Sequence, residues 1–517
     1  MNGAESLVET LAAGGVEVCF ANPGTSEMHF VAALDRTRRM RCVLALFEGV
    51  VSGAADGYGR MAGKPACTLL HLAPGFGNAA ANLHNARKAR TPIVNIVGDH
   101  ATYHAALDAP LAADVEGAAR PFSHWVRTSP SAAQVAVDGA AALAAARSWP
   151  GGVATLILPA DTAWNEAPGP AAILEPRPPQ PVDDAAIEAA ARLLQRPEPR
   201  LILIGGAVPA DARALALAAA IARHTGAELI APTANRRIER GRGRPQLERI
   251  PYPVDLALER LGRFRHVLLV EAAEPVAFFA YPGKPSRVLP PGCAFHALAR
   301  PEQSGVAALE RLAERLGVGK VVPPEIAERA GGAASCAGPV TAELVGHAVA
   351  ACLPENAIVV DEGITAGPAI YALTAAAAPH SWLSITGGSI GIGMPLAVGA
   401  AVACPERKVL SLQADGSGMY TLQALWTQAR EGLDVTTVVF ANRGYESLKT
   451  ELFKVGANPG RTALDMLEIN GPQLDWTSLA RGMGVEGERV EDGAALLRAL
   501  RRGLRSGGPY LIEAVVG

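Results

Sequence analysis

The sequence predicts an α/β protein of three domains, each with a mostly parallel sheet flanked by helices. Its 517 residues exceed what a single hydrophobic core usually serves. Short apolar runs alternate with helical patterns, and strands that are apolar on both faces are typical of parallel sheets covered by helices. Prolines crowd residues 167–181, which indicates an extended connector between folded units.

A second, weaker connector covers residues 317–338 and contains Val322-Pro323-Pro324. The two connectors divide the chain into predicted domains at 1–166, 183–316 and 339–517. Helices and strands alternate in the first of them. The predicted strands there are 16–21, 42–47, 66–72 and 93–98, and the predicted helices are 6–13, 28–34, 50–61 and 79–89.

Composition argues against nucleic-acid binding, secretion, membrane insertion and a disulfide framework. Charged residues make up 19% of the chain and the net charge is −3, so no basic face for nucleic acid is expected. Glu5 and Glu9 interrupt the apolar pattern of the first residues, which argues against a secretory signal. Glycines and Pro395 break the weakly charged stretch 386–404, which therefore predicts a buried loop and helix instead of a membrane span. Seven cysteines without any CxxC spacing indicate reduced thiols in a cytoplasmic protein.

The most informative pair of residues is Asp415 and Asn442. Each ends an apolar run, so both are predicted at the carboxyl ends of neighbouring parallel strands, where open α/β sheets bind ligands. Carboxylate, amide and carbonyl oxygens suit Mg²⁺, with phosphate oxygens completing the shell. Gly416 would let a phosphate approach the backbone, and Ser417 adds a hydroxyl at a helix start. Taken alone, Asp415 could equally cap a helix in an ordinary turn.

These residues resemble the signature of the thiamine-diphosphate-dependent decarboxylase and acetolactate synthase superfamily. That signature starts with Gly-Asp-Gly and ends with Asn-Asn, and here Ala414 and Ala441 replace one residue of each part. Neither replaced position supplies a metal-binding side chain in the family. The resemblance implies Mg²⁺ held by the side chains of Asp415 and Asn442 and by the carbonyl of Gly444.

Glu48 follows the predicted strand 42–47 and opens a helix. A helix N-terminal acid that interacts with the helix dipole would explain it without any catalytic role. The family, however, places at this strand end the glutamate that hydrogen-bonds the aminopyrimidine of thiamine diphosphate. The resemblance therefore implies that Glu48 promotes removal of the thiazolium C2 proton.

Two turns of the first domain resemble the benzoylformate decarboxylase pattern. The segment Asn22-Pro23-Gly24-Thr25 matches a turn that carries a substrate-binding serine, and Leu70-His71-Leu72 matches one that carries an active-site histidine. The resemblance implies that Thr25 binds the substrate carboxylate, that His71 acts as an acid or base, and that Asn78 lies nearby. A capping hydroxyl and an ordinary core histidine are the structural alternatives.

The central domain carries two strong predicted strands, Arg200–Ile204 and His266–Val270. Gly205-Gly206 follows the first, but the GxGxxG dinucleotide fingerprint is absent from this position. Related enzymes hold FAD or ADP in this domain in some cases, and we expect no cofactor there. Phe278-Phe279 falls near the position of a second active-site histidine of benzoylformate decarboxylase, which argues against simple equivalence with that enzyme.

The third domain supplies the other half of the cofactor site by resemblance. Thr365 would meet the diphosphate. In the glycine-rich segment from Gly387 to Pro395, the Gly388 carbonyl would accept from the pyrimidine amine and Ile390 would wedge the cofactor into a V shape. Leu448 is a candidate wall of the substrate pocket, although close packing explains such glycines and apolar residues equally well.

The resemblance implies an enzyme that uses thiamine diphosphate and Mg²⁺ to decarboxylate a 2-oxo acid through an enamine and release an aldehyde. A carboligase such as acetolactate synthase is the alternative, and a non-catalytic binder of a diphosphate cofactor is an alternative of another class. Since the family's cofactor bridges two subunits, a homodimer at minimum and a homotetramer are expected. The identity of the 2-oxo acid does not follow from the sequence.

Overall fold

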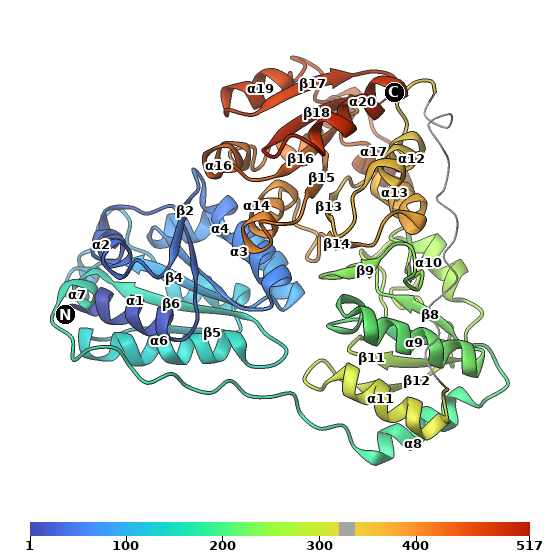
Figure 1. Cartoon of the computed structure of the whole chain (residues 1–517), viewed down its shortest axis with the longest axis horizontal. Coiled ribbons are helices and arrows are strands. Elements are labelled where there is room, and N and C mark those ends of the chain that lie inside the picture. Colours follow the sequence, from blue (N-terminus) through green and yellow to red (C-terminus); the bar gives the residue numbers. More distant parts are fainter. Residues whose placement is uncertain (320–336, 517) are drawn as a thin grey trace.

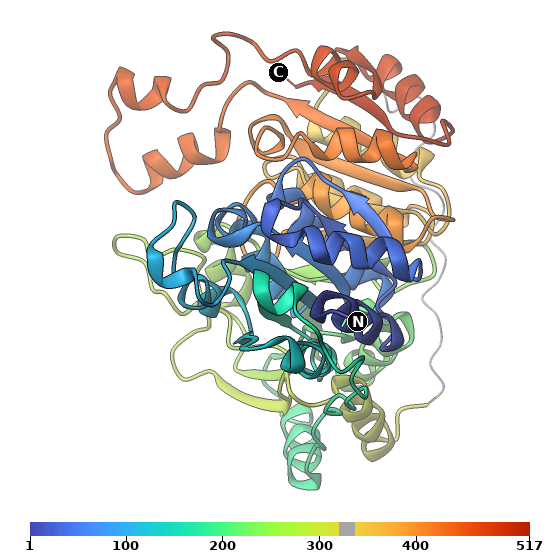
Figure 2. The same ribbon diagram turned by 90° about the vertical axis from the view of Figure 1, so that its left-hand side faces the viewer.

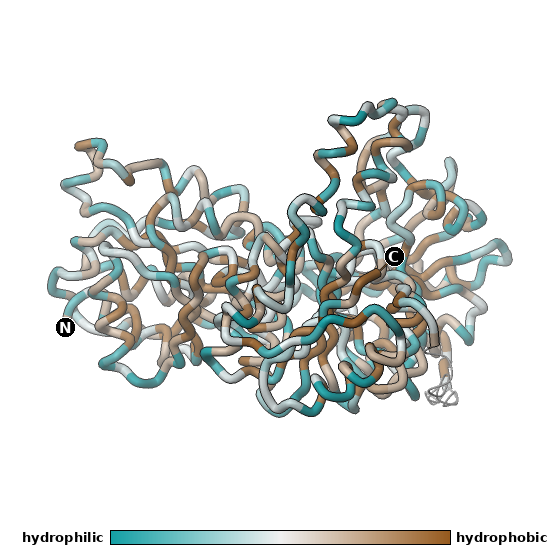
Figure 3. Tube along the Cα trace, turned by 90° about the horizontal axis from the view of Figure 1, so that it is seen from above, coloured by the Kyte–Doolittle hydropathy of each residue, from teal (hydrophilic) through white to brown (hydrophobic). Residues whose placement is uncertain are grey.

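The computed structural model, which describes residues 1–319 and 337–516, contains three separate sheets flanked by helices (Figure 1). The first sheet lies on the amino-terminal side, the second on the green and yellow side, and the third on the carboxyl-terminal side of Figure 1. Hydrophobic residues are frequent in the interior of the trace, and hydrophilic residues are frequent in its outer turns (Figure 3). The fold class predicted from the sequence is therefore confirmed.

The first sheet has six parallel strands in the order β2-β1-β3-β4-β6-β5. Its strands are β1 Val18–Ala21, β2 Arg41–Leu44, β3 Ala66–Leu70, β4 Ile93–Asp99, β5 Trp125–Thr128 and β6 Val153–Pro159. Its main helices are α1 Gly3–Ala13, α2 Met28–Thr37, α3 Glu48–Ala62, α4 Leu72–Ala89, α5 Val115–Ala119, α6 Ala132–Arg147 and α7 Ala160–Trp164.

The second sheet has five parallel strands in the order β10-β8-β7-β11-β12. They are β7 Arg200–Ile204, β8 Glu228–Ala231, β10 Glu248–Arg249, β11 His266–Val270 and β12 Ala294–Ala299, accompanied by the helices α8 Asp184–Leu194, α9 Ala212–Thr225, α10 Val254–Leu261 and α11 Gly305–Leu316. The bounds of β7 and β11 coincide with the two strands predicted there. A further short strand, β9 (Ile238–Arg240), leaves this sheet and joins the third one.

The third sheet has the order β17-β18-β16-β15-β13-β14-β9, parallel except for β9. Its other strands are β13 Ile358–Glu362, β14 His380–Ser384, β15 Val409–Ala414, β16 Val435–Ala441, β17 Glu486–Val490 and β18 Tyr510–Val515. The helices are α12 Ala342–Cys352, α13 Gly367–Leu373, α14 Gly393–Ala403, α15 Asp415–Gly418, α16 Ala424–Glu431, α17 Glu446–Lys454, α18 Arg461–Asp465, α19 Trp476–Gly482 and α20 Gly493–Gly503.

The boundaries predicted on either side of His71 are wrong, and the strand predicted over 42–47 ends at Leu44. The strand predicted over 66–72 ends at Leu70, and the helix predicted from residue 79 begins at Leu72. Pro74 fits the first turn of this helix because that turn needs no backbone N–H from it. The amide of Gly75 already donates to the carbonyl of His71 at 2.8 Å.

Glycines allow helix α3 to pack directly against α14, which joins the first and third sheets into one core. A Cβ atom at Gly57 would lie 2.1 Å from the carbonyl oxygen of Leu396, and one at Gly399 would lie 1.8 Å from that of Ala54. Both distances are far below van der Waals contact, so any larger residue would push the two helices apart. This crossing fixes the helix that Glu48 opens against the helix that follows the glycine-rich segment.

None of the helices in the described part of the chain combines the length and hydropathy that a membrane crossing needs. The predicted buried loop and helix over 386–404 corresponds to α14 and the turn before it, and α14 is buried along its length. In the described ranges Cys19, Cys42, Cys67, Cys293 and Cys404 are free thiols, and Cys336 lies outside those ranges.

Strand β9 brings a cationic side chain into the third sheet. Arg240 lies with its guanidinium carbon 3.6 Å from the centre of the Tyr371 ring and 5.0 Å from that of Trp382. Beside it, His380 is completely buried and its Nδ1 donates to the carbonyl of Ala378 over 2.7 Å. Burial, and then the charge of Arg240, lower the pKa of His380 to about 3.

This depressed pKa predicts a pH dependence of stability. Because the folded-state pKa lies below the unfolded value of about 6.5, stability is fully present above pH 6.5 and is lost as the pH falls toward 3. At pH 4.5 the buried imidazole should cost about 2–3 kcal/mol relative to pH 7. We expect the melting temperature of His380→Asn to fall less between pH 7 and pH 4.5 than that of the wild type. Equal slopes for the two proteins would contradict this assignment.

Candidate active site

The predicted metal-binding residues lie at adjacent strand ends. Strands β15 and β16 are parallel neighbours with Ala414 paired to Phe440, so Asp415 and Asn442 leave the sheet at the same edge. The backbone N–H of Arg443 donates to Asp415 Oδ2 over 2.7 Å, which holds the loop that contains Asn442 and Gly444 against the carboxylate. Burial raises the pKa of Asp415. A bound cation would offset that cost of burying a charge.

The donor set at this edge fits a hard divalent cation. It offers the Asp415 carboxylate, the Asn442 amide oxygen, which accepts from the amide of Gly444 at 3.2 Å, and the Gly444 carbonyl. Only one of the three is charged, so phosphate oxygens of a bound diphosphate would have to complete an octahedral shell. Gly416 and Ser417 occupy the first turn of α15, and a Cβ atom on Gly416 would lie 2.5 Å from the Tyr445 ring.

Glu48 is the first residue of α3, as predicted, and it is buried to 8% exposure. Its Oε2 accepts a hydrogen bond from Asn78 Nδ2 at 3.0 Å. A Cβ atom at Gly75 would lie 2.9 Å from its other oxygen, Oε1, so the glycine leaves room beside the carboxylate. The structure thus brings Asn78 to Glu48, a contact that the sequence did not predict.

His71 is the residue that precedes helix α4, and it is paired with a buried acid. Its Nδ1 lies 2.8 Å from Glu27 Oε2, which also accepts from the amide of Gly24 at 2.7 Å. Burial raises the pKa of Glu27, whose Oε1 has no hydrogen-bond partner. An imidazole whose Nδ1 is fixed by a carboxylate keeps Nε2 available for proton transfer.

Thr25, Thr365 and Leu448 are exposed, as are Asn78, Gly388 and Asn442. Thr25 begins the short helical turn η1 (Thr25–Glu27) that also carries Glu27, so it lies on the segment that contacts His71. Thr365 lies in the turn between β13 and α13. Leu448 lies on α17 and is half exposed. Figure 2 shows the orange-red segment that contains α17 projecting away from the third sheet.

The glycine-rich segment between β14 and α14 is held by a carboxylate that the sequence reasoning missed. Glu362, at the end of β13, is buried and accepts from the backbone N–H groups of Gly391 at 2.6 Å and Gly393 at 2.7 Å. It also accepts from Gln413 Nε2 at 2.9 Å, and Gln413 reaches Ser417 Oγ at 2.6 Å. One acid therefore fixes both the loop that carries Gly388 and Ile390 and the turn that carries Ser417.

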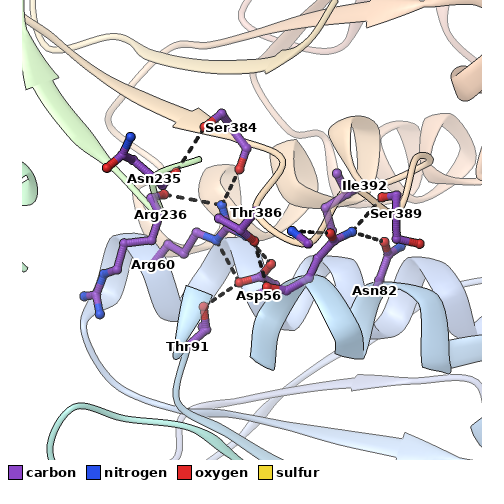
Figure 4. Close-up of polar contacts among 12 residues, drawn as sticks. Asp56, Arg60, Asn82, Thr91, Asn235, Arg236, Ser384, Thr386, Ser389 and Ile392 are labelled. Carbon is purple, nitrogen blue, oxygen red and sulfur yellow. Dashed lines mark hydrogen bonds and ion pairs between the residues drawn. The ribbon is translucent and has the colours of Figure 1, made fainter. Parts of the chain in front are cut away.

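Two asparagines of helix α4 hold the same loop from the other side. Asn85 accepts from the amide of Gly387 at 2.9 Å and donates to the carbonyl of Ser389 at 2.7 Å. Asn82 donates to the carbonyls of Gly49, at 2.8 Å, and Gly391, at 3.3 Å (Figure 4). The Asn82 side chain therefore links helix α3, which begins at Glu48, to the glycine-rich loop.

A fully buried ion pair completes this support (Figure 4). Arg60 bonds both oxygens of Asp56 at 2.8 and 2.5 Å, and both side chains have no solvent exposure. Arg60 also donates to the carbonyl of Ser384 at 2.7 Å and to the hydroxyl of Thr386 at 3.0 Å. Since every donor is used, the pair anchors α3 to the strand that leads into the glycine-rich loop.

Backbone strain gathers beside the predicted site residues. Leu72 follows His71 with φ 50°, Ile364 precedes Thr365 with φ 44°, and Arg443 lies between Asn442 and Gly444 with φ 61°. Positive φ is uncommon for such residues and, when it occurs, often marks ligand-binding or catalytic segments. Positive φ also occurs at ordinary helix ends such as Arg38 and Arg90, so these three turns are distinguished by the predicted site residues beside them.

Comparisons with known proteins agree with this geometry. Residues 1–118 match the family description "Thiamine pyrophosphate enzyme, N-terminal TPP binding domain", and residues 367–514 match the corresponding C-terminal TPP binding domain. The chain is 49% identical to IlvX of Mycobacterium tuberculosis, which carries the name of an acetolactate synthase large subunit, over 100% of this chain and 99% of the relative. The chain belongs to the thiamine pyrophosphate enzyme family.

Other members of the thiamine pyrophosphate enzyme family are decarboxylases by name. Benzoylformate decarboxylase of Pseudomonas aeruginosa is 29% identical over 98% of this chain and 97% of its own. The solved structure of a thiamine diphosphate-dependent 4-hydroxybenzoylformate decarboxylase from Rhodococcus jostii RHA1 superposes with a TM-score of 0.84 at 25% identity, covering 100% and 99% of the two chains. The protein is therefore a thiamine diphosphate-dependent enzyme of the decarboxylase and acetolactate synthase type.

The buried Arg60 pair generates a stability prediction. Arg60→Met would leave the Asp56 carboxylate buried without a cationic partner, which typically costs about 3–5 kcal/mol. We expect a clear drop in the melting temperature, together with faster amide hydrogen exchange at residues 384–391. Arg461→Met, which removes a cation from an exposed pair with Asp465, serves as the matched control and should leave both readouts unchanged.

Proposed function

We propose that this protein uses thiamine diphosphate and Mg²⁺ to decarboxylate a 2-oxo acid without oxidation and release an aldehyde. The observation that carries the proposal is the contact between the Arg443 amide and Asp415, which gathers three hard oxygen ligands at one sheet edge. In this proposal Asp415, Asn442 and the Gly444 carbonyl hold the metal, and Gly416, Ser417 and Thr365 meet the diphosphate. When bound, the cofactor supplies the electron sink that accepts the pair left by departing CO₂.

The protein side chains then have separate tasks. Glu48 would hydrogen-bond the aminopyrimidine ring of the cofactor, with Asn78 keeping its carboxylate in place. The Gly388 carbonyl would accept from the pyrimidine amine, and Ile390 would pack against the cofactor from the loop that Glu362 and Asn85 fix. Rigid support of this kind is what a precise cofactor geometry requires.

His71 and Thr25 favour the decarboxylase over the carboligase. In our proposal His71, oriented by Glu27, gives or takes a proton at the substrate, and the Thr25 hydroxyl binds the substrate carboxylate. Leu448 would form part of the wall around the substrate side chain. The carboligase alternative, an acetolactate synthase reaction, is favoured by the name of the 49% identical relative.

The proposed assembly is a homodimer at minimum and a homotetramer in full, in the cytoplasm. Family resemblance supports it, because one cofactor there lies between the first domain of one subunit and the third domain of another. We further propose domain limits at 1–166, 183–316 and 339–517, supported by the three sheets that lie within those limits, β9 excepted. Light scattering of the purified protein measures the assembly directly.

The first test is cofactor dependence. Protein freed of cofactor and metal by chelation should gain thermal stability from thiamine diphosphate with Mg²⁺ together, and much less from either alone. A panel of aromatic and aliphatic 2-oxo acids, analysed by mass spectrometry, should then yield an aldehyde and CO₂. An acyloin or acetolactate as the main product would favour the carboligase, whereas neither stabilisation nor turnover would refute both enzymes.

The second test is the substitution Glu48→Gln, which keeps the shape of the side chain and removes its charge. We expect turnover to fall at least about 100-fold, the scale of a lost proton-transfer group, because the glutamine cannot accept or share a proton. Cofactor affinity, measured by tryptophan fluorescence, should change only a few-fold. Exchange of the cofactor C2 proton for deuterium, followed by NMR, should slow in parallel with turnover.

The same variant separates the enzyme from a non-catalytic binder of the cofactor. A pure binder would show cofactor affinity but no turnover and no accelerated C2 exchange in the wild type. Ser417→Ala is the complementary control: since it touches the diphosphate side of the site, it should weaken cofactor binding while leaving the exchange rate of bound cofactor near the wild-type value.

A further inference from the structure

A cavity of about 180 Å³ lies at the junction of the three sheets and outside the proposed active site. Lys88 and Arg90 line it from the end of α4. Arg236 lines it from the segment between β8 and β9, and Thr386 lines it from the turn that follows β14. Glu271, which follows β11, is the acidic residue on its wall. Three cations and one carboxylate leave a net positive lining.

Cations near a helix end are by themselves ordinary, because they complement the dipole of α4. Arg236 is different, since it comes from another part of the chain and its Nε is buried with no hydrogen-bond partner. Burial also lowers the pKa of Arg236. A buried donor without a partner usually signals a water or an ion that belongs in the space beside it. Figure 4 shows the Arg236 side chain directed away from Arg60, whose contacts use only the Arg236 carbonyl.

The carboxylate of Glu271 is already satisfied and therefore does not neutralise these cations by direct contact. Its Oε2 accepts from the amide of Ala207 and its Oε1 from the amide of Gly305, each at 2.6 Å. Glu271 itself has φ 49°, a strained conformation for glutamate. These amides lie after β7 and at the start of α11, where an α/β sheet would otherwise bind the phosphates of a nucleotide.

Size and charge together define the ligand. Pockets for nucleotide-sized ligands usually measure about 300–1,000 Å³, so this cavity is too small for one. Its phosphate-binding amides are occupied by Glu271. The side-chain donors of the lining are Lys88, Arg236 and Arg90, and Arg90 also forms an ion pair with Glu302 at 3.9 Å. Compact anions with several acceptor oxygens match such donors.

We propose that this cavity is a binding site for a small phosphate-sized anion that ties the three sheets together. The anion would accept from Arg236 on one side and from Lys88 and Arg90 on the other, and Thr386 would connect the site to the glycine-rich loop. Thr386 is already joined to that loop's support, because its hydroxyl donates to the carbonyl of Asn85 at 2.7 Å. The site is separate from the catalytic proposal and does not depend on it.

Inorganic phosphate is the probe for this site. The protein is first saturated with thiamine diphosphate and Mg²⁺, so that the proposed diphosphate position is filled, and phosphate then replaces chloride at constant ionic strength. We expect a saturable rise in melting temperature on the order of 3 °C at a large excess over the dissociation constant. Calorimetry gives the dissociation constant itself.

Three variants locate the effect. Arg236→Met should weaken phosphate binding at least tenfold, and Lys88→Met should do the same without risk to folding, because Lys88 is exposed. Arg213→Met removes an exposed cation of α9 in the same part of the chain and should bind like the wild type. The variants also identify the site when no cofactor is present. Phosphate bound at the proposed diphosphate position would be unaffected by substitution of Lys88 or Arg236.

A second arm distinguishes free phosphate from a phosphate carried by a nucleotide. ADP should bind at least tenfold more weakly than phosphate, or not at all. The proposal is overturned if the wild type shows no saturable response to phosphate, or if all variants respond equally. Tighter binding of ADP that is lost in Arg236→Met would also overturn it, because the cavity would then admit a nucleotide.

Discussion

A loop rich in glycine cannot hold its own shape, because it has few side chains to pack and many backbone conformations to lose on folding. The loop between β14 and α14 therefore depends on polar groups of its neighbours. Glu362 accepts from its amides on one side, and Asn85 both donates to it and accepts from it on the other. The positions of Gly388 and Ile390, which we propose contact the cofactor, depend on these contacts.

The buried Arg60–Asp56 ion pair depends on groups from distant parts of the sequence. A buried ion pair contributes little net stability, but leaving one partner alone is costly. Arg60 is satisfied only when α3, Ser384 and Thr386 are all in place. The charge therefore selects one mutual arrangement of the first and third sheets, at a place where a small displacement would alter the proposed active site.

Features that depend on local sequence patterns could be predicted, whereas contacts between distant residues could not. That Asp415 and Asn442 leave one edge could be predicted, since the ends of parallel strands coincide and each residue follows an apolar run. Glu48 opened its helix as expected. The start of α4 was misjudged because a proline and a glycine suggested a turn where they lie in a first helical turn. Glu27 and Glu362 lie close in sequence to Thr25 and Thr365, but their importance depends on contacts with His71 and with amides far along the chain, which no local pattern encodes.

Strand β9 links the second sheet's segment to the third sheet in a way that bears on how such proteins can be cut and recombined. It pairs antiparallel with β14 and closes one edge of the third sheet, where Trp382 faces Ile238. Excision of the segment would uncover a row of unpaired backbone groups on a strand that leads directly into the glycine-rich loop. Exposed edges of this kind recruit other strands and promote aggregation. The segment that contains β9 thus covers the edge strand β14, and a shortened version of the protein would need another strand or loop to cover it.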